Sequence, residues 1–138
     1  MERIICLAIG YLFGMFQTSY IIGKIHHMDI RQYGSGNAGT TNALRTLGKK
    51  AGAMTLIGDM LKCVIAILIV DAVFKNRYQE ILPLLGMYTA AGCVLGHNFP
   101  FYLGFRGGKG IAASAGMLLA MDWRVFLICA VIFIGLVA

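Results

Sequence analysis

The sequence predicts an all-α fold, a polytopic integral membrane helical bundle. Of the 138 residues, 59% are hydrophobic and only 13% are charged, whereas soluble domains carry about 25% charged and about 45–50% apolar residues. The mean hydropathy is correspondingly high, at +0.77. Long apolar segments also alternate with short polar loops along the whole chain. We therefore expect a single transmembrane domain over residues 1–138.

The first apolar segment runs from Ile4 to Gly23 without a charged residue. A helix needs about 20 apolar residues to cross the hydrocarbon core, so this segment is long enough. A cleaved signal peptide fits less well, because Glu2 offsets the charge of Arg3, the apolar run is too long, and no small-residue cleavage site follows. We expect a retained transmembrane helix.

Two further apolar segments follow. The second runs from about Ala51 to Phe74, and charged residues interrupt it at positions 59, 62 and 71. The third runs from Ile81 to about Phe101, and its Pro83 suits the first turn of a helix. We expect both to be transmembrane helices.

The last part of the chain is less regular. Ile111 to Met121 is too short to cross a bilayer and is expected to be a half-span or re-entrant piece. From Val125 the chain is apolar to its last residue, without a polar tail. We expect a C-terminally truncated chain.

Most of the basic residues lie in two alternate loops, which accounts for much of the formal charge of +6. The positive-inside bias marks such loops as cytoplasmic. The charge thus indicates topology and contact with anionic lipid, and we expect no nucleic-acid partner. The residues concerned are Lys24, Arg31, Arg45, Lys49 and Lys50 in one loop and Arg106 and Lys109 in the other.

Small residues recur four apart in the apolar segments, as at Gly10 and Gly14 and at Gly92 and Gly96. This spacing lets helix backbones approach closely in lipid and favours a packed bundle. The four cysteines are far apart and form no C-x-x-C pair, so they predict neither a disulfide framework nor a metal site.

Asp59 and Lys62 lie three positions apart within the second apolar segment. Charges inside a membrane are costly, and an i, i+3 pair can neutralise itself while facing the bundle interior. Two interpretations stay open: a buried ion pair that fixes helix packing, or the wall of a polar site.

His97 follows Gly96 near the end of the third segment. With no carboxylate or cysteine nearby in sequence, it gives only a weak signal for a metal site or a general base. We expect a hydrogen-bonding residue that orients the following loop.

The loop from Gly104 to Gly110 resembles a Walker A motif but lacks its spacing. Leu103 stands where the first glycine should be, and Gly110 replaces the Ser or Thr that would hold magnesium. Its glycines still expose backbone N–H groups beside Arg106 and Lys109, which suits a phosphate or carboxylate. The alternative is a flexible loop whose basic residues face lipid.

A second glycine-rich stretch, GSGNAGTTNALR, spans residues 34–45. Its three glycines fit the dinucleotide-binding pattern, but membrane segments flank it where that pattern requires a strand and a βαβ unit. It has many donor side chains, and both glycine-rich loops are expected on the cytoplasmic side of the membrane. Together these features predict a phosphorylated, water-soluble ligand that meets a lipidic one.

The stretches 34–45 and GHNFPFYLGFRGGKG (96–110) resemble the signature loops of the bacterial acyl-phosphate:glycerol-3-phosphate acyltransferases. The resemblance implies acyl transfer from acyl phosphate to glycerol 3-phosphate, without acyl-CoA, acyl carrier protein or a cofactor. It also implies a bacterial plasma (inner) membrane protein with the N-terminus outside, cytoplasmic motif loops and about five of the family's seven transmembrane helices.

The resemblance further implies the roles of individual residues. Catalytic roles, as ligands of the substrate phosphates, fall to Ser35, Arg45 and Lys109. Asp59 and Lys62 would be structural or form the site wall, and no metal ligand is implied. The implied substrate-binding residues are Gly34, Gly36, Asn37, Gly39, Thr41, Asn42, His97, Asn98, Arg106, Gly107, Gly108 and Gly110.

The chain departs from the family pattern in two places. The family's third polar motif lies beyond Ala138, and Cys63 replaces the last glycine of the family's Gly-Asp-x-x-Lys-Gly segment. Two other functions therefore stay open: a membrane channel or transporter for an organic phosphate, and a catalytically degenerate membrane protein.

Overall fold

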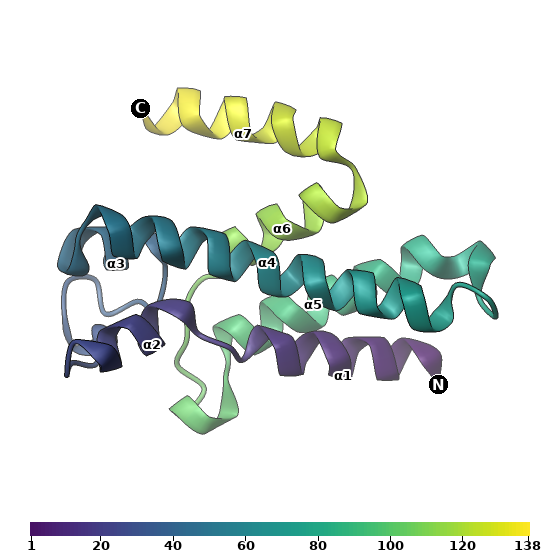
Figure 1. The fold of residues 1–138 in the computed structure, drawn as a ribbon, viewed down its shortest axis with the longest axis horizontal. Coiled ribbons are helices and arrows are strands. Elements are labelled where there is room, and N and C mark those ends of the chain that lie inside the picture. Colours follow the sequence, from purple (N-terminus) through teal and green to yellow (C-terminus); the bar gives the residue numbers. More distant parts are fainter.

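The computed structural model describes residues 1–138, which form helices and loops without a strand. The all-α prediction is thus confirmed. The elements are α1 (Glu2–Gly14), α2 (Thr18–Ile25), η1 (Ile30–Gln32), α3 (Thr40–Leu47), α4 (Lys49–Phe74), η2 (Gln79–Ile81), α5 (Leu82–Asn98), η3 (Phe101–Leu103), α6 (Ile111–Met121) and α7 (Trp123–Val137). Figure 1 shows α1, α4 and α5 lying lengthwise in one elongated bundle.

The first apolar segment, predicted as one transmembrane helix from Ile4 to Gly23, is a candidate membrane span, Glu2–Ile25, but it consists of two helices, α1 and α2, with an unpredicted break between them. The chain leaves the helix between α1 and α2, where Gln17 is extended. Buried groups from other helices bind the exposed backbone: the Lys62 ammonium donates to the carbonyl oxygens of Gly14 (3.1 Å) and Phe16 (2.7 Å). A tertiary contact therefore stabilises a break that the hydrophobic pattern does not reveal.

Helices α1 and α5 run parallel and pack with their backbones in direct contact. A Cβ added at Gly10 or Gly14 would collide with the backbone of Thr89 or Cys93 in α5. Conversely, a Cβ added at Gly92 or Gly96 would collide with the backbone of α1. These glycines, spaced four apart, thus form one interface between α1 and α5, and the predicted close packing of helix backbones is confirmed.

Helix α4 packs against both helices in the opposite direction and carries the apolar core. Cys63 and Ile67 of α4 pack with Ala90 and Cys93 of α5 and with Ala113 of α6. The predicted second span is confirmed as α4, a helix of 26 residues that is long and apolar enough to cross a membrane. The third segment is also helical, as α5, whose second residue is Pro83, and its crossing of the membrane stays a prediction. Cysteines here act as small apolar residues.

The last two helices form a hairpin. Helix α6 has 11 residues, too few to cross a bilayer, as predicted. Gly116 lets it lie directly against the Met60 backbone of α4. The Asp122 carboxylate caps α7 by accepting from the Arg124 N–H (2.9 Å), and α7 then runs back along the outside of α6 (Figure 1).

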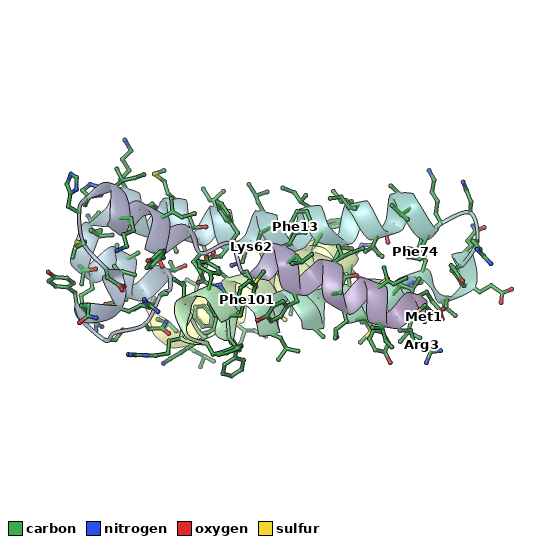
Figure 2. The ribbon with its side chains drawn as sticks, turned by 90° about the horizontal axis from the view of Figure 1, so that it is seen from below. Met1, Arg3, Phe13, Lys62, Phe74 and Phe101 are labelled. Atoms are coloured by element: carbon green, nitrogen blue, oxygen red, sulfur yellow. The ribbon has the colours of Figure 1, made fainter.

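The two ends of the bundle differ in composition. Met1, Arg3 and Phe74 lie at one end, and Lys62 lies near the middle, close to the end of α1 (Figure 2). The other end carries α2, α3 and both glycine-rich loops, and with them the basic residues of those loops. Two stretches, Glu2–Ile25 and Lys49–Phe74, are long and apolar enough to cross a membrane.

The glycine interface predicts a position-specific effect of alanine substitution. Gly92→Ala should lower the stability by about 1–3 kcal/mol, because its Cβ would collide with the Leu7 carbonyl oxygen. Gly86→Ala on the same helix is the control, since its Cβ would meet only Ile67 Cγ2 at 3.7 Å. Thermal unfolding midpoints in detergent measure the difference, and equal midpoints would contradict the assigned interface.

Candidate functional site

The first glycine-rich loop is built around the buried side chain of Asn42. Its Nδ2 lies within hydrogen-bond distance of the carbonyl oxygens of Ile30 (3.1 Å), Tyr33 (3.0 Å) and Asn37 (3.0 Å). Its Oδ1 accepts from the Ser35 N–H (3.1 Å). Both ends of the amide are thus used by the loop, so Asn42 contributes to the site by shaping the backbone.

Glycines supply the backbone conformations that this loop needs. Gly34 and Gly36 have φ values of 55° and 75°, a left-handed region that other residues rarely adopt. A Cβ at Gly34 would also collide with Asn42 Oδ1. The glycine pattern therefore encodes a turn around Asn42.

Arg31 ties the first loop to the second. Its guanidinium forms a two-point ion pair with Asp29, from Nε to Oδ1 (3.0 Å) and from Nη2 to Oδ2 (2.9 Å). Its Nη1 donates to the carbonyl oxygens of Leu103 (2.7 Å) and Arg106 (3.3 Å). Hydrogen bonding from Arg31 lowers the pKa of Asp29 below its usual 3.8. The tether is therefore intact at neutral pH.

The second glycine-rich loop packs on the end of α5. The N–H of Gly107 donates to the Asn98 carbonyl oxygen (3.0 Å), and the N–H of Gly108 donates to that of His97 (3.1 Å). A Cβ at Gly107 would collide with the His97 carbonyl oxygen. Only glycine fits this close approach.

The two loops also touch directly. A Cβ at Gly108 would lie 2.6 Å from the carbonyl oxygen of Ala38, which belongs to the first loop. The predicted convergence of the two loops is therefore confirmed.

The N-termini of two helices lie next to this contact between Gly108 and Ala38. Helix α3 starts after Gly39 and α6 after Gly110, and neither has a side-chain cap. The first helical bonds are from Ala43 N–H to Gly39 O and from Ser114 N–H to Gly110 O, so the preceding amides of each helix have no protein acceptor. Free amides at the positive end of a helix dipole bind anions.

The polar side chains predicted to bind phosphate are exposed and free. Ser35, Arg45, Arg106 and Lys109 all lie at the loop end of the bundle. None of these four side chains makes a hydrogen bond or an ion pair with the protein, so none of them connects one loop to the other. Their polar groups thus remain available to a ligand.

The remaining predicted residues lie on the same two loops. Gly39 is the N-cap of α3, and Thr41 is exposed in its first turn. A Cβ at Gly39 would approach Asn37 Nδ2 (2.8 Å), and one at Gly110 would approach Asn98 Oδ1 (2.9 Å). That Asn98 oxygen is buried and has no hydrogen-bond partner.

A buried charged cluster lies beneath the second loop. Lys62 Nζ is 3.1 Å from Asp59 Oδ1, and both side chains are at most 4% exposed. The predicted i, i+3 ion pair is thus confirmed. Thr18 Oγ1 also donates to Asp59 Oδ1 (3.1 Å), and His97 Nδ1 lies 2.7 Å from Lys62 Nζ. His97 is therefore a hydrogen-bonding residue, and a carboxylate does lie near it, 3.9 Å away.

Three residues that hold the site together are not predicted from the sequence as site residues. The sequence assigns Arg31 only a role in membrane topology, although the Asp-x-Arg spacing could have indicated a local ion pair. Gln17 is buried and donates to the His97 carbonyl oxygen (2.7 Å). Tyr102 donates to the Met15 carbonyl oxygen (2.6 Å) at the break of the first segment.

Comparison with known proteins identifies the family. Residues 4–138 match the family model described as glycerol-3-phosphate acyltransferase. The chain belongs to the glycerol-3-phosphate acyltransferase family. It is 53% identical to a glycerol-3-phosphate acyltransferase of Clostridioides difficile (98% of this chain, 66% of the relative). It is 46% identical to that of Lactiplantibacillus plantarum (99% and 64%). It thus spans about two thirds of the length of these curated relatives.

A solved structure of the family has the same fold. It is PlsY (YgiH), an integral membrane glycerol 3-phosphate acyltransferase, in its glycerol 3-phosphate form, with a TM-score of 0.82 and 34% identity over 99% of this chain and 66% of that one. The lysophosphatidic acid form of the same enzyme gives a TM-score of 0.80 and 33% identity. The predicted helical membrane fold is thereby confirmed, and so is the family resemblance.

The tether between the loops predicts the effect of Arg31→Gln. Without the guanidinium, hydrogen exchange of the amides at 103–106 should rise, while exchange in α4 and α5 should stay unchanged. In the wild type, the contribution of the Asp29–Arg31 pair is fully present above pH 3.8 and is lost only as the pH falls through the lowered pKa of Asp29. Wild-type exchange, corrected for its intrinsic pH dependence, should therefore agree between pH 5 and 7; a variant with wild-type protection would contradict the tether.

Proposed function

We propose that the protein transfers an acyl group from acyl phosphate to glycerol 3-phosphate, giving lysophosphatidic acid and phosphate for phospholipid synthesis. One observation carries the proposal: two uncapped helix N-termini and two contacting glycine loops lie together at one end of a membrane bundle, an arrangement that favours anion binding. Family membership supports the same reaction, since its relatives are named for glycerol 3-phosphate acylation.

Substrate binding follows from the free donors of the site. Ser35, Arg45 and Lys109 would bind the substrate phosphates together with the N-terminal amides of α3 and α6. Gly107 and Gly108 would let glycerol 3-phosphate approach the backbone closely. The relative PlsY, whose fold this chain shares, has been solved in a glycerol 3-phosphate form and a lysophosphatidic acid form, which supports a polar substrate and a lipid product at such a site.

The reaction asks little of the protein beyond positioning. Acyl phosphate is a mixed anhydride: the glycerol 3-phosphate hydroxyl attacks its carbonyl carbon, the carbon–oxygen bond to phosphate breaks, and the leaving phosphate carries the electron pair. The hydroxyl proton passes to substrate phosphate. Oriented donors hold both substrates and stabilise the charge that develops on the carbonyl oxygen. His97 Nδ1 contacts Lys62, so a serine–histidine nucleophilic pair is not part of the proposal.

The acyl chain would lie in an apolar groove that opens at the break between α1 and α2. The groove has a volume of about 330 Å³ and is lined by Phe13, Phe16, Gly58, Leu61, Lys62 and Ile65. Lys62 of the buried charged cluster forms part of its wall, and His97, which contacts Lys62, lies against the second loop. An acyl group could therefore reach from lipid toward the anion site.

The gathering of basic residues at one end supports a membrane orientation. The two loops would face the cytoplasm of a bacterial plasma (inner) membrane, and the N-terminus would lie outside. The chain would act as one transmembrane acyltransferase domain with about five of the family's seven transmembrane helices. Acyl phosphate, and neither acyl-CoA nor acyl carrier protein, would be the direct donor.

A transporter of an organic phosphate is less well supported. Such a protein needs polar residues along a path through the bundle, yet residues 63–70 of α4, between Lys62 and Asp71, are all apolar. This apolar stretch of α4 favours a site that opens at one end of the bundle, as expected for an enzyme that keeps its product on one side.

Lys109→Ala tests the proposed function. The substitution should lower kcat/KM for transfer from palmitoyl phosphate to glycerol 3-phosphate by about 100-fold or more, because a donor that stabilises phosphate charge is lost. The control is Lys75→Ala, which lies at the C-terminal end of α4, at the end of the bundle away from the two loops, and should retain the wild-type rate. Absence of transfer by the wild-type chain, or full activity of Lys109→Ala, would contradict the proposal.

A further inference from the structure

The Lys62 ammonium group lies at the centre of the buried polar interior. Four acceptors surround Nζ: the carbonyl oxygens of Gly14 and Phe16, Asp59 Oδ1 and His97 Nδ1, at distances of 2.7–3.1 Å. An ammonium group only donates hydrogen bonds. The ammonium has three N–H groups for these four acceptors, so one N–H is shared between two of them. A proton on His97 Nδ1 would point at Nζ and find no acceptor there, so Nδ1 carries none.

The same geometry fixes the charge of His97. A protonated imidazole would place a second positive charge within 2.7 Å of the ammonium, and two buried like charges at this distance repel each other strongly. The imidazole is therefore neutral. With Nδ1 unprotonated, its single proton is on Nε2.

The Nε2 atom faces the second glycine loop. A Cβ added at Gly108 would collide with it, so the absent side chain leaves space at this edge of the ring. No group of the protein accepts a hydrogen bond from Nε2. The His97 side chain is only 2% exposed, and an N–H without a protein partner beside a loop with free donors is available to a ligand.

We propose that Lys62 is a positioning residue of the active site: it holds His97 as the Nε2–H tautomer, whose N–H donates to the substrate phosphate at the glycine loop. Asp59 keeps the ammonium charged and in place, and Thr18 in turn orients Asp59. This inference rests on the proposed function of the loop as a phosphate site. It assigns His97 a donor role, whereas its approach to Asp59 alone could suggest a general base.

The contacts of Lys62 also close the break between α1 and α2, so a purely structural role must be separated from the positioning role. A structural role predicts the same loss of activity whatever residue occupies position 97. A positioning role predicts that the loss depends on the imidazole, because only an imidazole has two tautomers.

A double-mutant cycle separates these roles. Lys62→Met removes the ammonium and keeps the chain length, and it should lower kcat/KM for glycerol 3-phosphate by about 10- to 100-fold. His97→Gln keeps an N–H donor near the Nε2 position without a tautomer to fix. In the His97→Gln background, Lys62→Met should cost less than about threefold. Equal losses in both backgrounds would overturn the proposal in favour of a structural role.

The tautomer can be measured without any enzyme activity. The chain has three histidines, so His26→Gln/His27→Gln leaves His97 as the sole source of imidazole ¹⁵N signals. Long-range ¹H–¹⁵N correlation in nanodiscs should show the Nε2–H form, and it should persist in Lys62→Arg, which keeps a donor. Lys62→Met should give a mixture of tautomers, with Lys75→Met as the matched control.

The two readouts keep the inference distinct from the proposed function. An Nδ1–H or doubly protonated His97 in the wild type would overturn the positioning role even if acyl transfer is observed. The Nε2–H form in a wild-type chain without acyl transfer would support the role of Lys62 and contradict the proposed reaction alone. Retention of the pure Nε2–H form in a folded Lys62→Met variant would also overturn the role.

Discussion

The fold depends on one buried interaction, between the Lys62 ammonium and the break of the first membrane segment. Unpaired backbone carbonyls in a membrane interior are costly, and so is an unpaired buried charge. Here the two groups satisfy each other. The carbonyl oxygens of Gly14 and Phe16 accept hydrogen bonds from the Lys62 ammonium, and the Asp59 carboxylate balances its charge. Removing either partner leaves the other without compensation.

The glycine interface brings the remaining groups to this break. Because α1 and α5 approach at backbone contact through Gly10, Gly14, Gly92 and Gly96, the end of α5 lies beside the end of α1. His97 therefore reaches Lys62, and its carbonyl oxygen accepts from Gln17. The second glycine loop starts from this fixed end of α5, so a packing interface inside the bundle positions the site at its surface.

Local sequence patterns predicted those features that local sequence determines. The span of α4, the helix α5, the short α6, the contact of the two glycine loops and the Asp59–Lys62 pair all follow from hydropathy, composition or spacing, and the structure confirms them. The break between α1 and α2 could not be predicted in this way, because the apolar run is continuous and the stabilising ammonium comes from α4. The role of Arg31 was missed for a similar reason, since its carbonyl partners lie more than seventy residues away.

The central claim is that the two loops form a single phosphate site, and equilibrium binding of radiolabelled glycerol 3-phosphate tests it most directly. The account predicts saturable binding by the wild type that inorganic phosphate displaces and glycerol does not. It also predicts that Gly108→Ala, whose Cβ would collide with His97 and with Ala38 of the first loop, weakens binding by about tenfold or more. Gly135→Ala, with open space around it, should bind as the wild type does. Displacement by glycerol as effective as by phosphate, or unchanged binding by Gly108→Ala, would contradict the account.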